Sequence, residues 1–292
     1  MALNLEDRGT RANLLGLLAN SMLAVAKFVV GYVAASEALT ADGFNSAGDI
    51  FATVIAFVGY QYARKPADDD HHFGHGNAES VAGLIIGGVL FATGLFITID
   101  GVLWLIRRPA YPPDLLALWV ALGTVLVKEL LYQYVNRVGR QLNSPSLLAS
   151  ARDHRADVLI ALTVVAGIIG AQYEMPSLDP LAAVLVGIYI AWMALAPIFS
   201  NVAVLMDKAP RELGEEIRKV VLSDCEVSDV SNIRIHPLGS YFMVDLEIYL
   251  DGAMDLLSAH EVAHRVADLV AERVAHVQHV NVHVNPREDR NL

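Results

Sequence analysis

Cysteine and net positive charge are both scarce in this sequence. A single cysteine, Cys225, among 292 residues excludes a disulfide framework and any zinc cluster built from cysteines. The formal net charge of −11 argues against nucleic acid as a partner, because nucleic acids bind basic surfaces. A glycine-rich phosphate loop of the Walker type is also missing, so we do not expect ATP to drive the protein.

Apolar residues make up 54% of the chain and gather into six long runs. The runs lie at roughly 12–35, 38–62, 80–106, 115–136, 147–170 and 179–206. A membrane-spanning helix needs about 20 mostly apolar residues. We therefore expect an integral membrane protein whose residues 1–206 form a six-helix transmembrane domain in the lipid bilayer.

Basic residues between the runs predict the orientation, because cytoplasmic loops are enriched in Lys and Arg. The basic residues that flank one side are Arg8, Arg11, Arg64, Lys65, Arg137 and Arg140. The opposite loops at 35–38 and 171–178 carry none, although Arg107 and Arg108 break the pattern. Six spans place both ends on one side, so we expect both termini in the cytoplasm of a bacterial inner membrane.

Residues 207–292 have a different pattern, with short apolar segments instead of long runs. Alternating apolar residues predict strands at 232–236, 242–250 and 280–284, with a turn at Leu238–Ser240. Helical spacing predicts helices at about 210–223 and at 258–274. The order α-β-β-α-β indicates a small cytoplasmic α+β domain, ferredoxin-like or metallochaperone-like, with helices on one face of the sheet.

Two apolar runs each carry a pair of oxygen ligands at four-residue spacing. The pairs are Asn45 with Asp49, and Asp153 with Asp157. Residues four apart on a helix share a face and lie about 6 Å apart along the axis. Ionisable side chains inside a membrane are costly and mark functional sites. If the two helices meet on these faces, three carboxylates and one amide form a cation site.

Other charged residues fall inside the runs. For Lys27 and Asp100 we expect pairing with another helix or a position near the membrane surface. Lys128 and Glu129 are adjacent, so their side chains project about 100° apart and cannot share a face of the helix. The sequence does not identify their partners.

The loop after the second run, residues 68–76, holds three aspartates, three histidines and two glycines. This composition is typical of a divalent-metal site, because carboxylate and imidazole are common metal ligands. The alternative is a solvated polar loop at the membrane surface.

These motifs together resemble the cation diffusion facilitator family. The second-helix signature matches at 40–49, the following loop at 65–80, and the fifth-helix motif at Asp153 to Asp157. The two-domain plan extends the resemblance over nearly the whole chain. Members of this family are generally homodimers that export divalent metal ions from the cytoplasm in exchange for protons.

The resemblance implies three sets of metal ligands. The transport site comprises Asn45, Asp49, Asp153 and Asp157, and the loop site comprises Asp68, His71 and His75. In the cytoplasmic domain the matching positions are His260 and His283, with Glu247 where zinc-type members often have histidine, and with His236 nearby.

The resemblance also implies an ion pair that this chain lacks. The family often has a lysine after Gly-His-Gly that pairs with an acid at the end of the sixth helix. Asn77 stands at the lysine position here, while the acid, Asp207, remains. The interlock between the membrane halves therefore differs in this chain.

The ligand types favour Mn²⁺ as the exported ion, with Fe²⁺ next. Oxygen-only sites suit harder ions, whereas imidazole and thiolate suit Zn²⁺. His154 is next to Asp153 but projects about 100° away, so we expect it to lie off the site. Mg²⁺ is disfavoured because it retains its waters.

Other functions remain open on the sequence alone. An exporter of Zn²⁺, Cd²⁺ or Co²⁺ has the same motifs, and Zn²⁺ binds an oxygen site tightly in vitro. A membrane metal sensor that does not transport would use the same tail. An intramembrane aspartyl protease leaves the histidines of the loop and tail unexplained, so we expect no enzyme.

Overall fold

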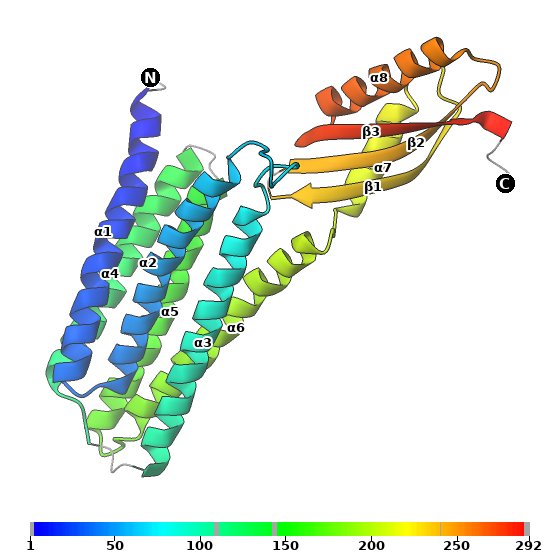
Figure 1. Cartoon of the computed structure of the whole chain (residues 1–292). Helices are drawn as coiled ribbons and strands as arrows, with labels where there is room; N and C mark the ends of the chain where they lie inside the picture. The colour runs from blue at the N-terminus through cyan, green and yellow to red at the C-terminus, as the bar shows by residue number, and fades with distance from the viewer. Residues whose placement is uncertain (1–2, 108–110, 142–144, 240, 289–292) are drawn as a thin grey trace. The chain divides into compact units, whose positions relative to one another are not determined.

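The computed structural model describes residues 3–107, 111–141, 145–239 and 241–288 (Figure 1). The helices of the first two thirds are α1 (Leu3–Val33), α2 (Glu37–Ala63), α3 (Ala78–Arg107), α4 (Leu115–Gln141), α5 (Pro145–Gln172) and α6 (Leu178–Leu205). Each overlaps one predicted run. Arg108, named for the orientation, and Ser240, named for the turn, lie outside the described residues, as do the side chains of Arg8, Arg11 and Arg107.

Five of these helices are long and apolar enough to span a membrane, judged over the described residues. The exception is α2, whose apolar run is interrupted by polar residues that include Asp42, Asn45 and Asp49. The sequence prediction of six spans is thus supported for five helices. For α2 it stays a prediction.

The chain divides into two compact units, which we describe separately. The first comprises Met1–Ile55 with Ile86–Ala196, and the second comprises Ala56–Ile85 with Pro197–Leu292. The second unit therefore includes the loop between α2 and α3 and the ends of three long helices. The predicted boundary between residues 206 and 207 stays a prediction.

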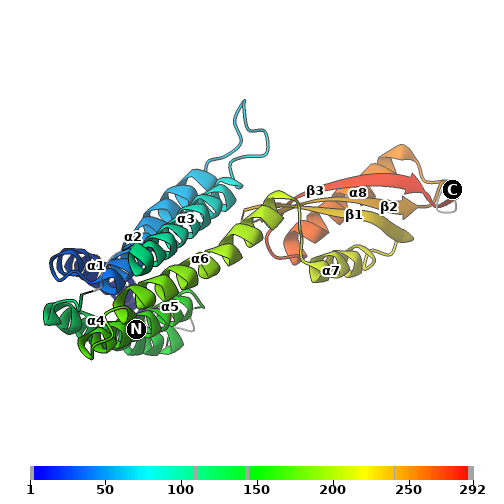
Figure 2. The ribbon, with the colours of Figure 1, turned by 90° about the horizontal axis from the view of Figure 1, so that it is seen from below.

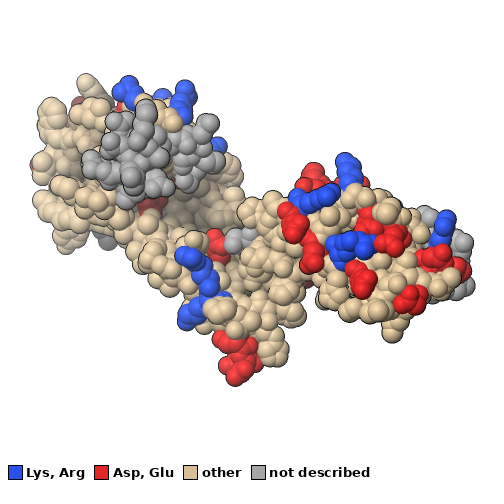
Figure 3. Space-filling view, turned by 90° about the horizontal axis from the view of Figure 1, so that it is seen from above, with Lys and Arg blue, Asp and Glu red and all other residues tan. Residues whose placement is uncertain are grey.

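The first unit is a helix bundle with a core of small and branched apolar residues. Alanines such as Ala38, Ala117 and Ala121 are fully buried, beside Ile168 and Ile190. Large apolar side chains cover the outside instead, among them Met22, Trp119, Leu159 and Trp192. Such an apolar exterior is the surface expected to face lipid. In Figure 3 the visible acidic and basic side chains lie mostly over the C-terminal α/β part.

Helices α3 and α6 approach closely at two glycines. A Cβ atom added at Gly94 would lie 2.6 Å from the carbonyl oxygen of Gly187, and one added at Gly187 would lie 2.8 Å from that of Gly94. Small residues at such crossings allow backbones to touch, which is a common basis of helix association in membranes.

The start of α2 is fixed by a side chain from α6. The buried carboxylate of Asp179 accepts hydrogen bonds from the Ser36 hydroxyl (2.7 Å) and from the backbone N–H of Glu37 (2.7 Å). An acidic group at a helix N-terminus satisfies backbone donors that lack a partner within the helix. This contact positions α2, which carries half of the predicted transport site.

The second unit contains the predicted α+β domain in the expected order. Its elements are α7 (Arg211–Val221), β1 (Asp229–Leu238), β2 (Tyr241–Leu250), α8 (Leu256–Arg273) and β3 (Val277–Pro286). The sheet order is β1-β2-β3, with β1 antiparallel and β3 parallel to β2. The parallel pair requires a crossover connection, which α8 provides.

Both short helices cover one face of this sheet (Figure 2). Ile217 of α7 and Val266 of α8 are fully buried against Leu246 and Ile248 of β2. Because side chains alternate along a strand, the residues between these face away from the helices. Asp245, Glu247 and His283 therefore lie on the open face of the sheet.

We predict that Gly94→Ala lowers the melting temperature of the detergent-solubilised protein, because the added methyl group overlaps the backbone of α6. Overpacking typically costs about 1–3 kcal/mol. Gly88→Ala is the matched control on the same helix, since nothing lies within 4 Å of its added Cβ. Equal melting temperatures for the two variants would contradict the close crossing.

Candidate metal centres

Helices α2 and α5 meet through the predicted transport residues. The side-chain amide of Asn45 donates to Oδ1 of Asp157 at 3.1 Å, and both side chains are buried. The two residues are 112 positions apart in the chain. A polar contact of this kind within an apolar bundle brings together one member of each predicted pair.

A lysine occupies the other oxygen of the same carboxylate. The Lys128 ammonium of α4 donates to Oδ2 of Asp157 at 2.5 Å and to Oδ1 of Asn20 in α1 at 2.8 Å. Lys128 is fully buried. An ammonium group buried without such partners is very unfavourable, so these contacts fix its position.

A second buried lysine is neutralised one helix away. Lys27 of α1 forms an ion pair with Asp42 of α2 at 2.8 Å and donates to the Ser46 hydroxyl at 2.9 Å. Both charged side chains are fully buried. The expectation that Lys27 pairs with another helix is confirmed, and α1, α2, α4 and α5 share one buried polar layer.

The other two predicted transport ligands lie at the next helical turn. Helices α2 and α5 run in opposite directions (Figure 1). Asp49, half-buried, and Asp153, exposed, therefore lie on the same side of the Asn45–Asp157 contact, about one turn or 6 Å along. Their oxygens and those of Asp157 do not form a compact cluster among the described side chains. The structure brings Asn45 and Asp157 into direct contact, and Asp49 and Asp153 lie about one helical turn from that contact.

Neighbouring polar residues point away from this contact, as the helical geometry predicts. His154 is buried against α1, where its Nε2 atom would lie 3.4 Å from a Cβ atom at Gly16. Glu129 forms an ion pair with Arg155 on the outer side of α4, whereas the adjacent Lys128 is buried inside the bundle.

The loop between α2 and α3 holds a compact ligand cluster. Ligand atoms of Asp68, His71 and His75 all lie within 4.8 Å of one another, and no other such group of three occurs in the described part of the chain. Nδ1 of His71 is 3.1 Å from Oδ1 of Asp68, and Nε2 of His75 is 3.4 Å from Oδ2. These three are the predicted loop residues, and their chemistry suits a divalent ion.

Local hydrogen bonds keep the aspartate of this loop charged. The backbone N–H of His71 donates to Oδ1 of Asp68 at 2.7 Å, with further bonds from the His71 ring and the Asp70 N–H. These donors, the His71 N–H first, lower the pKa of Asp68 below its ordinary value. The carboxylate is therefore ionised at neutral and mildly acidic pH and available as a ligand.

The loop also contacts the hairpin of β1 and β2 within the second unit. The Tyr241 hydroxyl donates to the carbonyl oxygen of Phe73 at 3.0 Å. A Cβ atom at Gly76 would lie 2.6 Å from the Leu238 carbonyl oxygen, and one at Gly239 would lie 2.3 Å from that of Gly76. Glycine at both positions permits this close approach of loop and hairpin.

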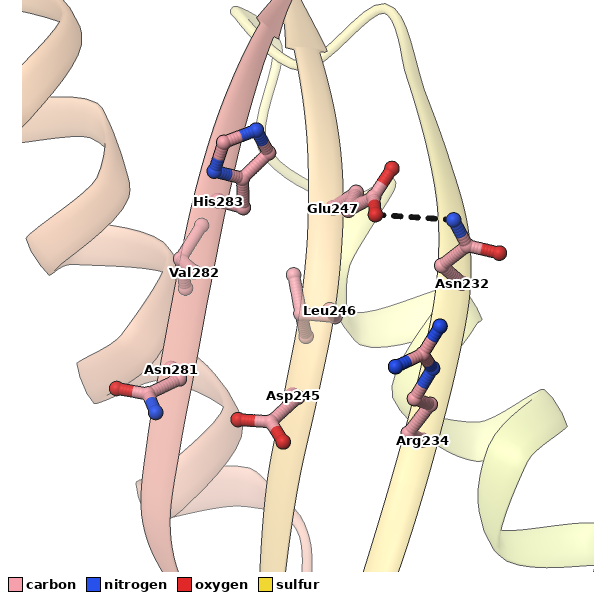
Figure 4. Close-up of a pocket in the computed structure, with 8 residues that line it drawn as sticks. All are labelled: Asn232, Arg234, Asp245, Leu246, Glu247, Asn281, Val282 and His283. Atoms are coloured by element: carbon pink, nitrogen blue, oxygen red, sulfur yellow. Dashed lines mark hydrogen bonds between the residues drawn. The ribbon is translucent and has the colours of Figure 1, made fainter.

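On the open face of the sheet, Glu247 and His283 lie side by side on β2 and β3 (Figure 4). Asn232 donates to Oε1 of Glu247 at 2.9 Å, and Asn285 donates to Oε2 at 3.2 Å. The Asn232 bond is the main cause that lowers the pKa of Glu247 below its ordinary value. This pair presents one carboxylate and one imidazole to a hollow on the sheet.

The remaining predicted ligands of this domain lie elsewhere. His260 is exposed on α8, which covers the opposite face of the sheet from His283. Its Nε2 atom lies 3.1 Å from Nε2 of His264, one turn along the helix. Two imidazole nitrogens bound to one ion at ~2.0–2.1 Å are about 3 to 3.4 Å apart. His264, which the resemblance did not assign as a ligand, is exposed and has the spacing of a second ligand.

His236, a predicted metal ligand, pairs with a carboxylate outside the sheet. Its Nδ1 atom pairs with the carboxylate of Asp207, just after α6. Asp207 is the acid for which the sequence offered no lysine partner. The side-chain oxygen of Asn77, at the expected lysine position, is buried without a hydrogen bond.

Buried oxygen ligands between apolar helices, with further ligand clusters outside them, define an integral membrane protein that handles cations. Comparison with known proteins agrees. The cation efflux transmembrane domain matches residues 14–206, and the cytoplasmic domain of cation efflux proteins matches residues 209–287. The chain belongs to the cation efflux family, the cation diffusion facilitators, and is a membrane transporter and not an enzyme.

Similar proteins extend over the full chain. Manganese efflux system protein MneP of Bacillus subtilis (strain 168) is 31% identical over 295 residues, which cover 98% of this chain and 99% of that protein. Manganese efflux system protein MneS of the same organism is 28% identical and covers 97% of both chains. A solved variant of the MamM C-terminal domain is 18% identical, with a TM-score of 0.26, and covers 26% of this chain and 92% of its own.

We predict that His71→Ala removes one bound Zn²⁺ per chain in calorimetric titration of the purified protein, because two remaining ligands hold the ion poorly. His72→Ala is the control, since His72 points to the Asp69 carbonyl oxygen and not into the cluster. Loss of one bound Zn²⁺ per chain in both variants would show that the cluster of Asp68, His71 and His75 is not the Zn²⁺ site.

Proposed function

We propose that this chain exports a divalent metal ion, Mn²⁺ first and Fe²⁺ next, from the cytoplasm in exchange for protons. It acts as a homodimer in a bacterial inner membrane, with both termini in the cytoplasm. The observation that carries this proposal is the buried contact of Asn45 with Asp157, which joins α2 and α5 by two oxygen-bearing ligands. Membership of a cation efflux family supplies the reaction class.

The preference for Mn²⁺ is supported by the donor set. Asn45, Asp49, Asp153 and Asp157 offer only oxygen atoms, and His154 faces α1 instead. Oxygen ligands suit harder divalent ions. The names of the two similar manganese efflux proteins also support Mn²⁺ as the exported ion.

Alternating access would assemble and open this ligand set. Asp49 and Asp153 lie about one turn from the Asn45–Asp157 contact and on the same side of it, so a small rearrangement of α2 against α5 would bring all four side chains to one ion. Three carboxylates at one place repel one another unless cations neutralise them. Metal ions and protons therefore compete for the same oxygens, which couples export of metal to import of protons.

The ligand groups outside the bundle have a regulatory role in this proposal. The loop cluster of Asp68, His71 and His75 contacts the β1–β2 hairpin through Tyr241, so metal in the loop stabilises that contact. In the tail, Glu247 with His283 and His260 with His264 form two separate pairs, one on each side of the sheet. Each pair needs further ligands from water or from the second subunit.

The test is transport into proteoliposomes that hold a pH-sensitive dye, with Mn²⁺, Fe²⁺, Co²⁺, Zn²⁺ and Cd²⁺ supplied in turn. We expect Mn²⁺ uptake with matched proton release, and loss of both in Asp157→Asn when equal amounts of folded protein are compared. Glu129→Gln is the control, because this carboxylate faces Arg155 outside the layer. Metal binding without uptake would establish a sensor instead.

A second prediction concerns the choice of metal. Asn45→His adds an imidazole ligand to the oxygen set, and imidazole favours Zn²⁺ over Mn²⁺. We expect the Zn²⁺/Mn²⁺ ratio of initial uptake rates to rise about tenfold, which corresponds to about 1.4 kcal/mol. A ratio equal to that of the unaltered protein would show that position 45 does not select the ion.

A further inference from the structure

Lys128 is the one buried cation that contacts a proposed transport ligand, among the residues the structure describes. Its ammonium donates to Oδ2 of Asp157 at 2.5 Å, while Oδ1 of the same carboxylate accepts from Asn45. Both oxygens of Asp157 are thus engaged. The other buried lysine, Lys27, is already neutralised by Asp42 and so does not share this role.

A metal ion bound through Asp157 and an ammonium on the same oxygen repel each other strongly. Bond lengths of about 2.1 Å to a metal place the two cations only about 4 Å apart. At such separation within a protein, like charges interact much more strongly than in water. A divalent ion therefore binds fully only when the ammonium withdraws.

We propose that Lys128 is a tethered counter-ion that competes with the transported metal for Asp157 and thereby sets the affinity and charge selectivity of the site. The inference rests on the proposed transport role of Asp157. The ammonium also donates to Asn20, at 2.8 Å, so Lys128 keeps one acceptor when it leaves the carboxylate. When the metal ion leaves, Lys128 returns to Asp157 and prevents the ion from binding there again.

This arrangement also discriminates against monovalent ions. Na⁺ or K⁺ brings the same charge that the tethered ammonium already supplies, but lacks the ammonium's fixed position beside the carboxylate. A divalent ion brings one more charge and can share Asp49 and Asp153 as well. The competition with Lys128 therefore favours divalent over monovalent cargo.

The test measures Mn²⁺ binding to the full-length protein in detergent by the electron paramagnetic resonance signal of free Mn²⁺. The loop cluster is first removed by His71→Ala, and binding that disappears in Asp157→Asn is assigned to the membrane site. On this background we expect Lys128→Met to raise the Mn²⁺ affinity of that site about tenfold or more. We also expect excess Na⁺ to compete with Mn²⁺ in Lys128→Met but not in its parent.

Arg155→Gln is the matched control, because it removes a positive charge from α5 at an exposed position paired with Glu129. The guanidinium pairs with Glu129 and not with Asp157, so we expect less than about a threefold change in affinity. An unchanged or weaker affinity in Lys128→Met would overturn the role of Lys128. Absence of any Asp157-dependent binding in the parent would overturn the transport site itself, and this inference with it.

Asn20→Leu provides an independent test in case Lys128→Met does not fold. It removes the alternative acceptor of the ammonium and leaves Lys128 in place. Because the ammonium then has nowhere to withdraw, we expect weaker Mn²⁺ binding at the membrane site. Unaltered affinity in Asn20→Leu would contradict the displacement of Lys128.

Discussion

A charge buried among apolar helices must be neutralised, and this constraint shapes the whole membrane part of the protein. Asp42 is neutralised by Lys27, and Asp157 by Lys128 together with the amide of Asn45. These contacts tie four helices into one polar layer. Removal of one partner from such a buried pair is strongly destabilising, which makes the layer a structural element as well as a ligand set.

The same constraint explains how a transport site can be switched. A carboxylate that always needs a positive partner accepts a metal ion, a proton or a lysine, and each of these excludes the others. The lysine is part of the chain, so its concentration beside Asp157 is fixed, whereas metal and protons vary with the compartment. On the proposed mechanism the site is therefore a competition among three cations, and transport would follow from which side supplies the strongest competitor.

The sequence predicted well those features that depend on periodicity within one element. The α-β-β-α-β order followed from apolar spacing. The composition of the loop predicted a metal site, and the resemblance to the cation diffusion facilitators assigned that site to Asp68, His71 and His75. Contacts that depend on how one helix is rotated against another were not predictable, and the pairing of Lys128 with Asp157 is the main example. The resemblance assigned both His260 and His283 as ligands of the cytoplasmic domain, but the alternation of side chains along β3 places His283 on the face opposite α8.

The most direct test of the account is the location of Mn²⁺ by anomalous X-ray scattering from crystals of the full-length protein in lipid. We predict an anomalous peak between α2 and α5, within bonding distance of Asn45 and Asp157, with the ammonium of Lys128 turned away toward Asn20. A peak only at the loop or tail ligands, with Lys128 still bound to Asp157 in the presence of saturating Mn²⁺, would contradict it.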